Sequence, residues 1–276
     1  MKYTGASLWN YQNMNFRERS WVPKEPRAVI VLIHGIGEHT GRYAGTAAFF
    51  NGHGLAVTGF DLYGHGESPG KRGGTLGMEN TLAQLQSFVH MTTIEFKLPV
   101  VIYGHSMGGG LLAALLLRRR PPAMAAILSA PGLRITNTPP VKKALLRVLD
   151  KVIPNMQISQ GFDASKLTKD TVELERYTRD KLNHGFATVR LAHEMISSGE
   201  WCIEHADQLH IPLLIMHGTA DAFTDIEGSR QFNGKAPRAL AYMLEWPGAY
   251  HELHNEPERE EILGAAVNWL EAIWPD

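Results

Sequence analysis

The stretch PVVIYGHSMGGGLLAALLLRRR (residues 99–120) decides the fold. Its first half is a run of β-branched and apolar residues, typical of a strand buried on both faces of a parallel sheet. Its second half predicts a helix over residues 107–118. Between them, Gly104 to Gly108 form a Gly-x-Ser-x-Gly pattern centred on Ser106. In a strand–turn–helix context this pattern projects a lone serine hydroxyl at the carboxyl edge of the sheet.

Apolar runs of the same kind lie on both sides of this stretch, and segments with helical periodicity separate them. Strands that alternate with helices predict βαβ units and a parallel sheet. The expected strands are residues 28–35, 55–61, 99–106, 124–131, 211–218 and 239–246, and the expected helices are residues 43–51, 77–96, 107–118 and 258–274. Residues 8–16 and 17–21 predict an opening antiparallel pair, with Pro23 and Pro26 marking the turn out of it.

The strand pattern stops between residues 132 and 207. That segment holds amphipathic, helix-prone stretches such as VKKALLRVLDKVI and DTVELERYTRDKL, and no strand-like run. The simplest interpretation is a helical cap inserted at the carboxyl edge of the sheet, where open α/β sheets bind their ligands. We therefore predict a core formed by residues 1–131 and 208–276, with a cap at residues 132–207.

Composition excludes several classes of function. The 276 residues carry a net charge of −1, which gives no field that would attract nucleic acid. A lone cysteine forms no internal disulfide, and the N-terminal segment lacks the apolar run of a signal peptide, so we expect a cytoplasmic protein. None of the 13 histidines shows the HExxH spacing, so neither a metal nor a cofactor is expected.

A serine hydroxyl needs a base, and the base needs a carboxylate that fixes its tautomer. With a nucleophile on such a turn, the chain order is serine, acid, histidine. Asp221 and His251 each follow a late strand at the edge where Ser106 lies. The rival Asp225 fits a helix N-cap better, and His210 and His217 flank a strand in structural positions. The sequence thus predicts a serine hydrolase of the α/β-hydrolase fold, with a mostly parallel central sheet and helices on both faces.

An oxyanion hole should complete this site. In this fold it combines the backbone amide that follows the nucleophile with one from the loop after the first core strand. These amides belong to Met107 and Ile36. Gly35 and Gly37 would let the backbone approach the substrate closely.

Six motifs in this sequence together resemble those of a known protein family. They are HGIGEHTGRY (34–43), DLYGHGESPG (61–70), GHSMGG (104–109), SAP (129–131), HGTAD (217–221) and YHELHNE (250–256). In this order they resemble the monoacylglycerol lipase family, and the likeness runs from residue 28 to the C-terminus, including cap segment 153–170. The resemblance implies hydrolysis of a monoacylglycerol to glycerol and fatty acid through an acyl-enzyme on Ser106.

The same resemblance assigns further residues. Glu38, Arg42 and His254 match positions that surround the glycerol pocket in the family, although a local salt bridge or loop hydrogen bond would also explain each of them. The cap would form the acyl tunnel and contact membranes peripherally, or serve as an ordinary packed lid. Thr224 replaces a cysteine found in some members, away from the triad, which predicts weak sensitivity to thiol reagents. Cys202 should be buried packing.

Other functions remain open from the sequence. A lysophospholipase or a broad carboxylesterase shares these motifs, although no aromatic box for a choline headgroup is evident. An acyltransferase would use the same residues. A non-catalytic lipid or partner binder of this fold would require a damaged triad. Acyl chain length and oligomeric state are undetermined.

Overall fold

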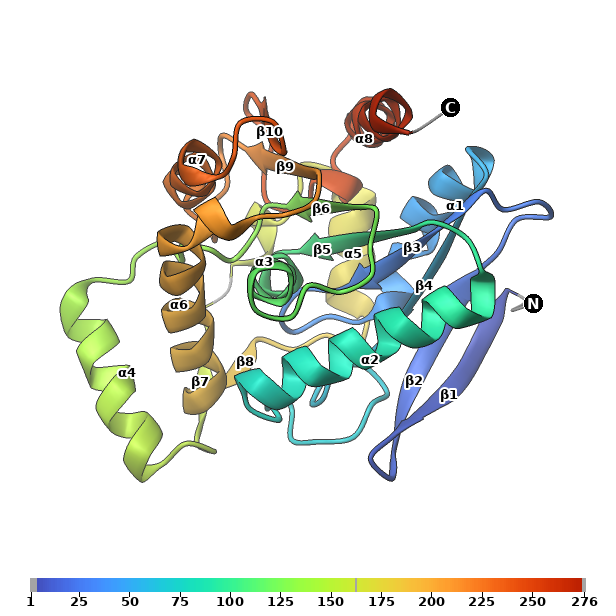
Figure 1. Ribbon diagram of the computed structural model, residues 1–276. Helices are drawn as coiled ribbons and strands as arrows, with labels where there is room; N and C mark the ends of the chain where they lie inside the picture. The colour runs from blue at the N-terminus through green and yellow to red at the C-terminus, as the bar shows by residue number, and fades with distance from the viewer. Residues whose placement is uncertain (1–3, 162, 275–276) are drawn as a thin grey trace.

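A mostly parallel sheet of eight strands forms the centre of the molecule (Figure 1), as the sequence predicts. The structure is a computed structural model that describes residues 4–161 and 163–274, so the ends of the predicted core and Phe162 of the cap segment lie outside it. The strands are β1 (Gly5–Tyr11), β2 (Met14–Trp21), β3 (Ala28–Ile33), β4 (Leu55–Phe60), β5 (Val100–His105), β6 (Ala125–Ser129), β9 (Leu213–Gly218) and β10 (Ala241–Trp246). Their order is β1-β2-β4-β3-β5-β6-β9-β10. The pairs β1–β2 and β2–β4 are antiparallel, and the other pairs of this sheet are parallel.

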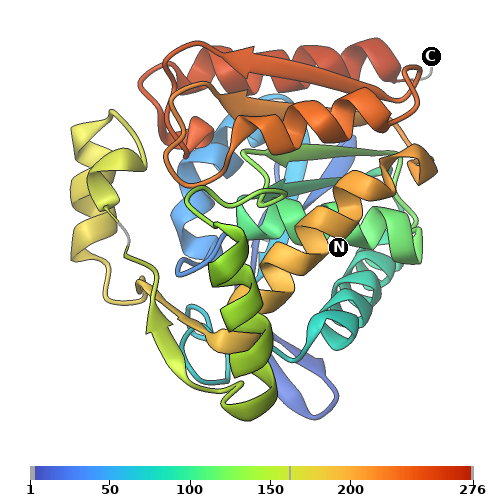
Figure 2. The same ribbon diagram turned by 90° about the vertical axis from the view of Figure 1, so that its left-hand side faces the viewer.

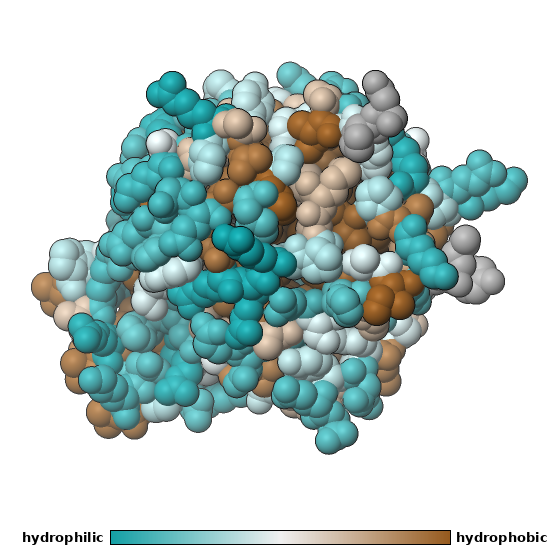
Figure 3. All heavy atoms as spheres, viewed as in Figure 1, coloured by the Kyte–Doolittle hydropathy of each residue, from teal (hydrophilic) through white to brown (hydrophobic). Residues whose placement is uncertain are grey.

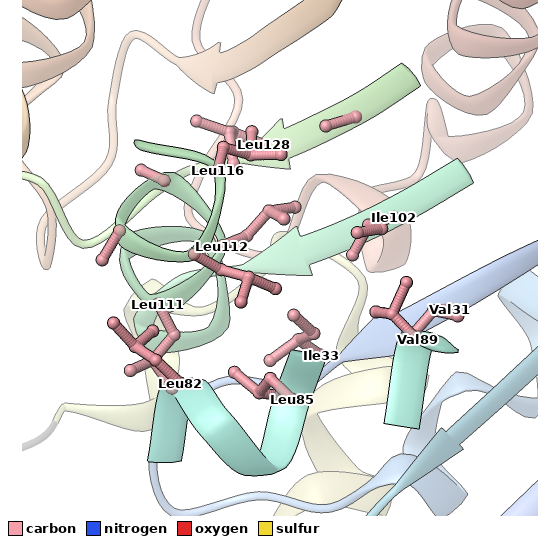
Figure 4. Close-up of a cluster of buried hydrophobic side chains, with 14 of the residues drawn as sticks. Val31, Ile33, Leu82, Leu85, Val89, Ile102, Leu111, Leu112, Leu116 and Leu128 are labelled. Carbon is pink, nitrogen blue, oxygen red and sulfur yellow. The ribbon is translucent and has the colours of Figure 1, made fainter. Parts of the chain in front are cut away.

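Helices cover both faces of this sheet because its inner strands carry buried side chains on both sides. On one face, leucines of α2 and α3 pack against Val31, Ile33 and Ile102 (Figure 4). On the other face, α1 and α8 cover Ile30 and Tyr103. These core helices are α1 (Ala44–Gly52), α2 (Met78–Phe96), α3 (Met107–Arg119), α7 (Ile226–Lys235) and α8 (Arg259–Ile273), with short 3₁₀ turns η1 (Thr40–Tyr43), η3 (Ala206–Gln208) and η4 (Leu253–Asn255).

The N-terminal pair is an antiparallel hairpin, but its predicted boundaries were wrong. The turn falls at Gln12 and Asn13, and not near Phe16. Both turn residues have positive φ, 49° and 63°, the conformation of a two-residue hairpin turn. Gln-Asn lacks the glycine that usually marks such a turn, so the sequence signal was weak.

The segment between β6 and β9 contains α4 (Pro140–Val152), β7 (Gln157–Ser159), η2 (Ala164–Lys166), α5 (Thr171–Arg179), β8 (Phe186–Thr188) and α6 (Val189–Glu204). Figure 2 shows α4 beside α6, with α5 apart from them. The expectation that this segment holds no strand was wrong, because β7 and β8 pair antiparallel. Three residues are too few for a visible alternation in the sequence. The division into core and cap at residues 132–207 stays a prediction.

Candidate active site

Ser106 lies on the tight turn between β5 and α3. Its φ of 54° and ψ of −119° are a strained conformation for a residue with a side chain. The flanking glycines permit it: a Cβ on Gly104 would lie 2.5 Å from the carbonyl oxygen of Gly108, and one on Gly108 would lie 2.2 Å from that of Ile33. Both glycines of the motif are therefore required by close backbone packing.

The three residues predicted from separate segments meet in one hydrogen-bonded chain. His251 Nε2 lies 2.9 Å from Ser106 Oγ, and His251 Nδ1 lies 2.7 Å from Asp221 Oδ2. Asp221 follows β9 and His251 follows β10, so parallel strands bring both to the edge where β5 ends. This geometry lets the imidazole accept the serine proton while the carboxylate fixes its tautomer.

The charge of Asp221 governs the basicity of His251. Burial alone would lower the pKa of this imidazole, but the Asp221 carboxylate and its hydrogen bond outweigh burial and raise the pKa above its ordinary value of 6.5. Burial likewise opposes ionisation of Asp221, yet His251 and His217 hold the pKa of its carboxyl well below the usual range. His251 is therefore a stronger base than a free histidine.

Three further residues hold Asp221, and the sequence analysis assigned none of them to the site. Phe223 donates its backbone N–H to the carboxylate at 2.7 Å. Thr224 donates from its backbone N–H (3.1 Å) and from Oγ1 (2.7 Å) to the carboxylate, so the expectation that this position is remote from the triad was wrong. His217, expected to be only structural, is fully buried with Nε2 3.2 Å from Asp221 Oδ2. The i, i+4 interval in HGTAD was the available signal. Asp225 caps α7 through Glu227 N–H, which confirms its predicted role.

Ile36 and Met107 are the two residues predicted to supply the oxyanion hole. Ile36 lines the same cavities as Ser106, and Met107 is the first residue of α3. Within the described chain no hydrogen-bond acceptor engages either backbone N–H. Both amides are therefore available to a substrate oxygen, as the oxyanion-hole prediction requires, and the N-terminus of α3 adds the positive end of its dipole.

Two cavities of different character meet at Ser106. A cavity of about 310 Å³ extends beneath α4 and α6, and its apolar wall includes Leu146, Ala192 and Ile196. A second cavity of about 20 Å³, room for about one water molecule, is lined mainly by residues of the core loops, most of them polar, and by Leu167 and Tyr177. Ile36, Ser106 and His251 line both cavities.

The small cavity contains a buried cluster of charges. Glu38 and Arg42, both predicted around a glycerol pocket, line it together with Glu252, which the sequence analysis did not identify. Arg42 binds Glu252 through two hydrogen bonds of 2.6 and 2.7 Å and binds Glu38 at 2.7 Å. The local salt bridge considered for Glu38 and Arg42 is therefore present.

His254 lies one layer behind this cavity. It is fully buried, its ring stacks on Tyr43 at 4.6 Å, and it does not line either cavity beside Ser106. His105 lies between His254 and the small cavity. It lines that cavity and packs against both His251 and His254. Burial lowers the pKa of His105 and of His254 to about 3, so both rings are neutral.

Comparison with known proteins supports the family. The family described as serine aminopeptidase, S33 (Hydrolase_4) matches residues 24–258. The chain is 32% identical to a monoacylglycerol lipase of Mycolicibacterium smegmatis, over 91% of this chain and 90% of that protein. It is also 32% identical to phospholipase YtpA of Bacillus subtilis, over 90% and 96% respectively. An abhydrolase domain-containing protein of Dictyostelium discoideum is 34% identical over 91% of this chain, which spans 27% of that longer protein.

A solved structure gives the same result. The crystal structure of a monoacylglycerol lipase from Paleococcus ferrophilus has a TM-score of 0.86 and 32% identity, and the match covers 95% of this chain and 100% of that one. The resemblance predicted from the six motifs is thereby confirmed. This chain belongs to the serine aminopeptidase S33 family of α/β-hydrolases, which it shares with monoacylglycerol lipases, and it is a carboxylic ester hydrolase.

Proposed function

We propose that this enzyme hydrolyses monoacylglycerols to glycerol and free fatty acid, with Ser106 as nucleophile, His251 as general base and Asp221 as its orienting carboxylate. One observation carries this proposal. The hydrogen-bonded chain Ser106–His251–Asp221 stands at the junction of a large, partly apolar cavity and a small polar one. An ester with one long apolar arm and one short polar arm matches that junction.

The reaction proceeds in two halves. His251 removes the proton of Ser106 as Oγ attacks the ester carbonyl, and the amides of Ile36 and Met107 stabilise the negative oxygen of the tetrahedral intermediate. His251 then donates the proton to the departing glycerol oxygen, which leaves an acyl-enzyme. Water, activated by the same imidazole, attacks the acyl carbonyl, and the fatty acid leaves as Ser106 regains its proton.

The charges of the small cavity favour a neutral headgroup. Glu38 and Glu252 bring two negative charges against the single positive charge of Arg42, and both carboxylates already engage that guanidinium. A phosphate headgroup would therefore meet net negative charge and no free arginine. Glycerol hydroxyls carry no charge and donate hydrogen bonds to carboxylates. The relatives named monoacylglycerol lipase support the same assignment.

We assign headgroup contact to Glu38 and Arg42 at the mouth of the small cavity. His254 would act indirectly, since His105 separates it from that cavity. At about 20 Å³ the cavity admits one hydroxyl-sized group. The rest of the glycerol would lie toward the larger cavity.

The test is release of fatty acid from 1-monooleoylglycerol, lysophosphatidylcholine and p-nitrophenyl butyrate, with Ser106→Ala as the control. Preference for the monoglyceride, abolished by the substitution, is the expected result. Preference for the lysophospholipid would instead support the alternative that the relative named phospholipase YtpA favours. Activity on the short ester alone would make the enzyme a carboxylesterase.

We also propose peripheral membrane contact through α4. The exposed side chains Val141, Leu145, Val148 and Val152 form one stripe at helical spacing, and Val141 is 80% exposed. Hydrophobic atoms accordingly project at the left edge of the molecule, over α4 (Figure 3). An amphipathic helix of this kind lies in a membrane interface. No helix in the described part of the chain is long and apolar enough to span a bilayer.

Vesicle binding tests this second proposal. Val148→Glu places a charge in the middle of the stripe and should weaken sedimentation with phosphatidylglycerol vesicles several-fold, while hydrolysis of p-nitrophenyl butyrate stays unchanged. Equal binding of both proteins would show that α4 does not enter the interface. Cytoplasmic location stays a prediction.

A further inference from the structure

Two loops that carry different parts of the proposed catalytic machinery are joined by one buried ion pair. Arg42 belongs to the loop after β3, which also holds Ile36, and Glu252 directly follows His251 in the loop after β10. The guanidinium and the carboxylate form two parallel hydrogen bonds of 2.6 and 2.7 Å. Their side chains are only 7% and 3% exposed. Such two-pronged pairing fixes orientation as well as distance.

Further hydrogen bonds hold both members of this pair. Glu38 Oε2 binds Arg42 at 2.7 Å, and Glu38 Oε1 accepts hydrogen bonds from the backbone N–H of Gly35 at 2.5 Å and from Tyr43 Oη at 2.7 Å. Gly35 is the residue immediately before Ile36, so Glu38 fixes the peptide group that precedes the proposed oxyanion amide by one residue. At the other end, Asn255 Nδ2 donates to Glu252 Oε2 at 2.8 Å.

We infer that Glu252 is a positioning residue: its pairing with Arg42 keeps the proposed base His251 and the proposed oxyanion amide of Ile36 in register around Ser106. This inference rests on the proposed catalytic roles and adds a residue to them. Glu252 contacts neither His251 nor Ser106 through a hydrogen bond, and two of its three side-chain hydrogen bonds go to Arg42. Its effect on the placement of these groups is therefore exerted through the loops, in addition to the effect of its charge on the pKa of His251.

A positioning role and a headgroup-binding role predict different kinetics. If the pair only binds glycerol, its loss raises KM for a monoglyceride and leaves an ester without glycerol unaffected. If it positions the catalytic groups, its loss lowers kcat on both esters, because a displacement of about 1 Å costs up to about a hundredfold in rate. Glu252→Gln should lower kcat between about tenfold and a hundredfold on 1-monooleoylglycerol and on p-nitrophenyl butyrate alike, with KM nearly constant.

A second variant separates positioning from folding. Removing one partner of a buried ion pair leaves the other charge buried and unpaired, whereas replacing all of its charges with uncharged residues is often neutral for stability. Glu38 also pairs with Arg42 and must lose its charge as well. The triple variant Glu38→Gln/Arg42→Met/Glu252→Leu should fold, as judged by its melting temperature, and still show the reduced kcat on both esters. Wild-type kcat in this folded variant would assign the pair a purely structural role and overturn the inference.

The chain offers a control pair whose side chains are exposed, at 40% and 46%. Arg27 and Glu271 form another two-pronged pair, which joins the start of β3 to the end of α8, away from both cavities. Glu271→Gln should leave kcat on both esters unchanged. A loss in Glu252→Gln confined to the monoglyceride, through KM, would overturn the inference in favour of headgroup contact. Because p-nitrophenyl butyrate also reports the effect, the result stands even if monoglycerides prove not to be the substrate.

Discussion

The two cavities beside Ser106 are built from different parts of the chain. Most of the wall of the large cavity comes from residues between β6 and β9, including Leu146 on α4 and Ile196 on α6. The small cavity is formed mainly by the loops after β3, β5 and β10, with Leu167 and Tyr177 closing it from the cap side. The inserted segment thus surrounds the space proposed for the acyl chain, while the core loops surround the headgroup and the reacting atoms.

This difference has a chemical consequence. The core loops are tied together by charge-assisted hydrogen bonds such as Arg42–Glu252, which hold catalytic groups within narrow tolerances. The apolar wall on α4 requires less exact placement of its side chains, because apolar contacts lack direction and tolerate changes of shape. Substitutions in the small cavity should therefore affect the chemistry on every ester, and substitutions in the large cavity should affect selectivity among acyl chains.

The strongest test removes the groups that both cavities share. Ser106→Ala should lower kcat by about 10⁴-fold or more on every ester, because the nucleophile is lost. The double variant with His251→Ala should lose no more than that, since residues that act as a unit are not additive. Turnover of purified protein measures both effects. Losses that multiply in the double variant would show that the two residues act independently.

A pH profile of the activity tests the role of His251, which lines both cavities, as the base. The base must be neutral to accept a proton, so kcat/KM should fall about tenfold per pH unit below the pKa of His251. Burial alone would lower that pKa, but the Asp221 carboxylate raises it, with Glu252 and Glu38 acting in the same direction. As the pH falls, half of the activity should therefore already be lost at a pH above 6.5. Asp221→Asn should move this midpoint to lower pH. A flat profile between pH 5 and 8 would contradict the assignment of the base.

Substitution in the large cavity should have a smaller and selective effect. Ala192→Phe on α6 adds a ring to the cavity wall and should lower kcat/KM for 1-monooleoylglycerol by about tenfold, because the long chain loses space and apolar contact. p-Nitrophenyl butyrate, whose acyl chain is short, should be hydrolysed at nearly the wild-type rate. Equal losses on both esters would mean that the cavity does not hold the acyl chain.

The smallest effect should come from a residue outside both cavities. Cys202 on α6 is fully buried, and burial raises the pKa of its thiol to about 12, so little reactive thiolate forms at neutral pH. N-ethylmaleimide at low dose should leave activity unchanged, and Cys202→Ser serves as the control. Rapid inactivation of wild-type enzyme alone would show that α6 opens in solution.

Much of the fold and the site was predictable from local patterns. Buried parallel strands such as β5 read as continuous apolar runs, and close backbone packing requires the glycines on both sides of Ser106. Asp221 and His251 followed from chain order and from the ends of strands. The turn at Gln12 and the short strands of the cap were missed, because neither carries a glycine signal or enough residues for a period.

The sequence by itself determined the parallel sheet and the three residues that meet at its carboxyl edge, because strand periodicity, glycine spacing and chain order are local properties. Only the tertiary structure decided that Thr224 and His217 hold Asp221, that His254 stands behind His105, and that Arg42 binds Glu252. The last pair joins residues 210 positions apart in the chain. A contact of that kind depends on the packing of two loops that follow β3 and β10, strands that are not adjacent in the sheet, and no local pattern encodes it.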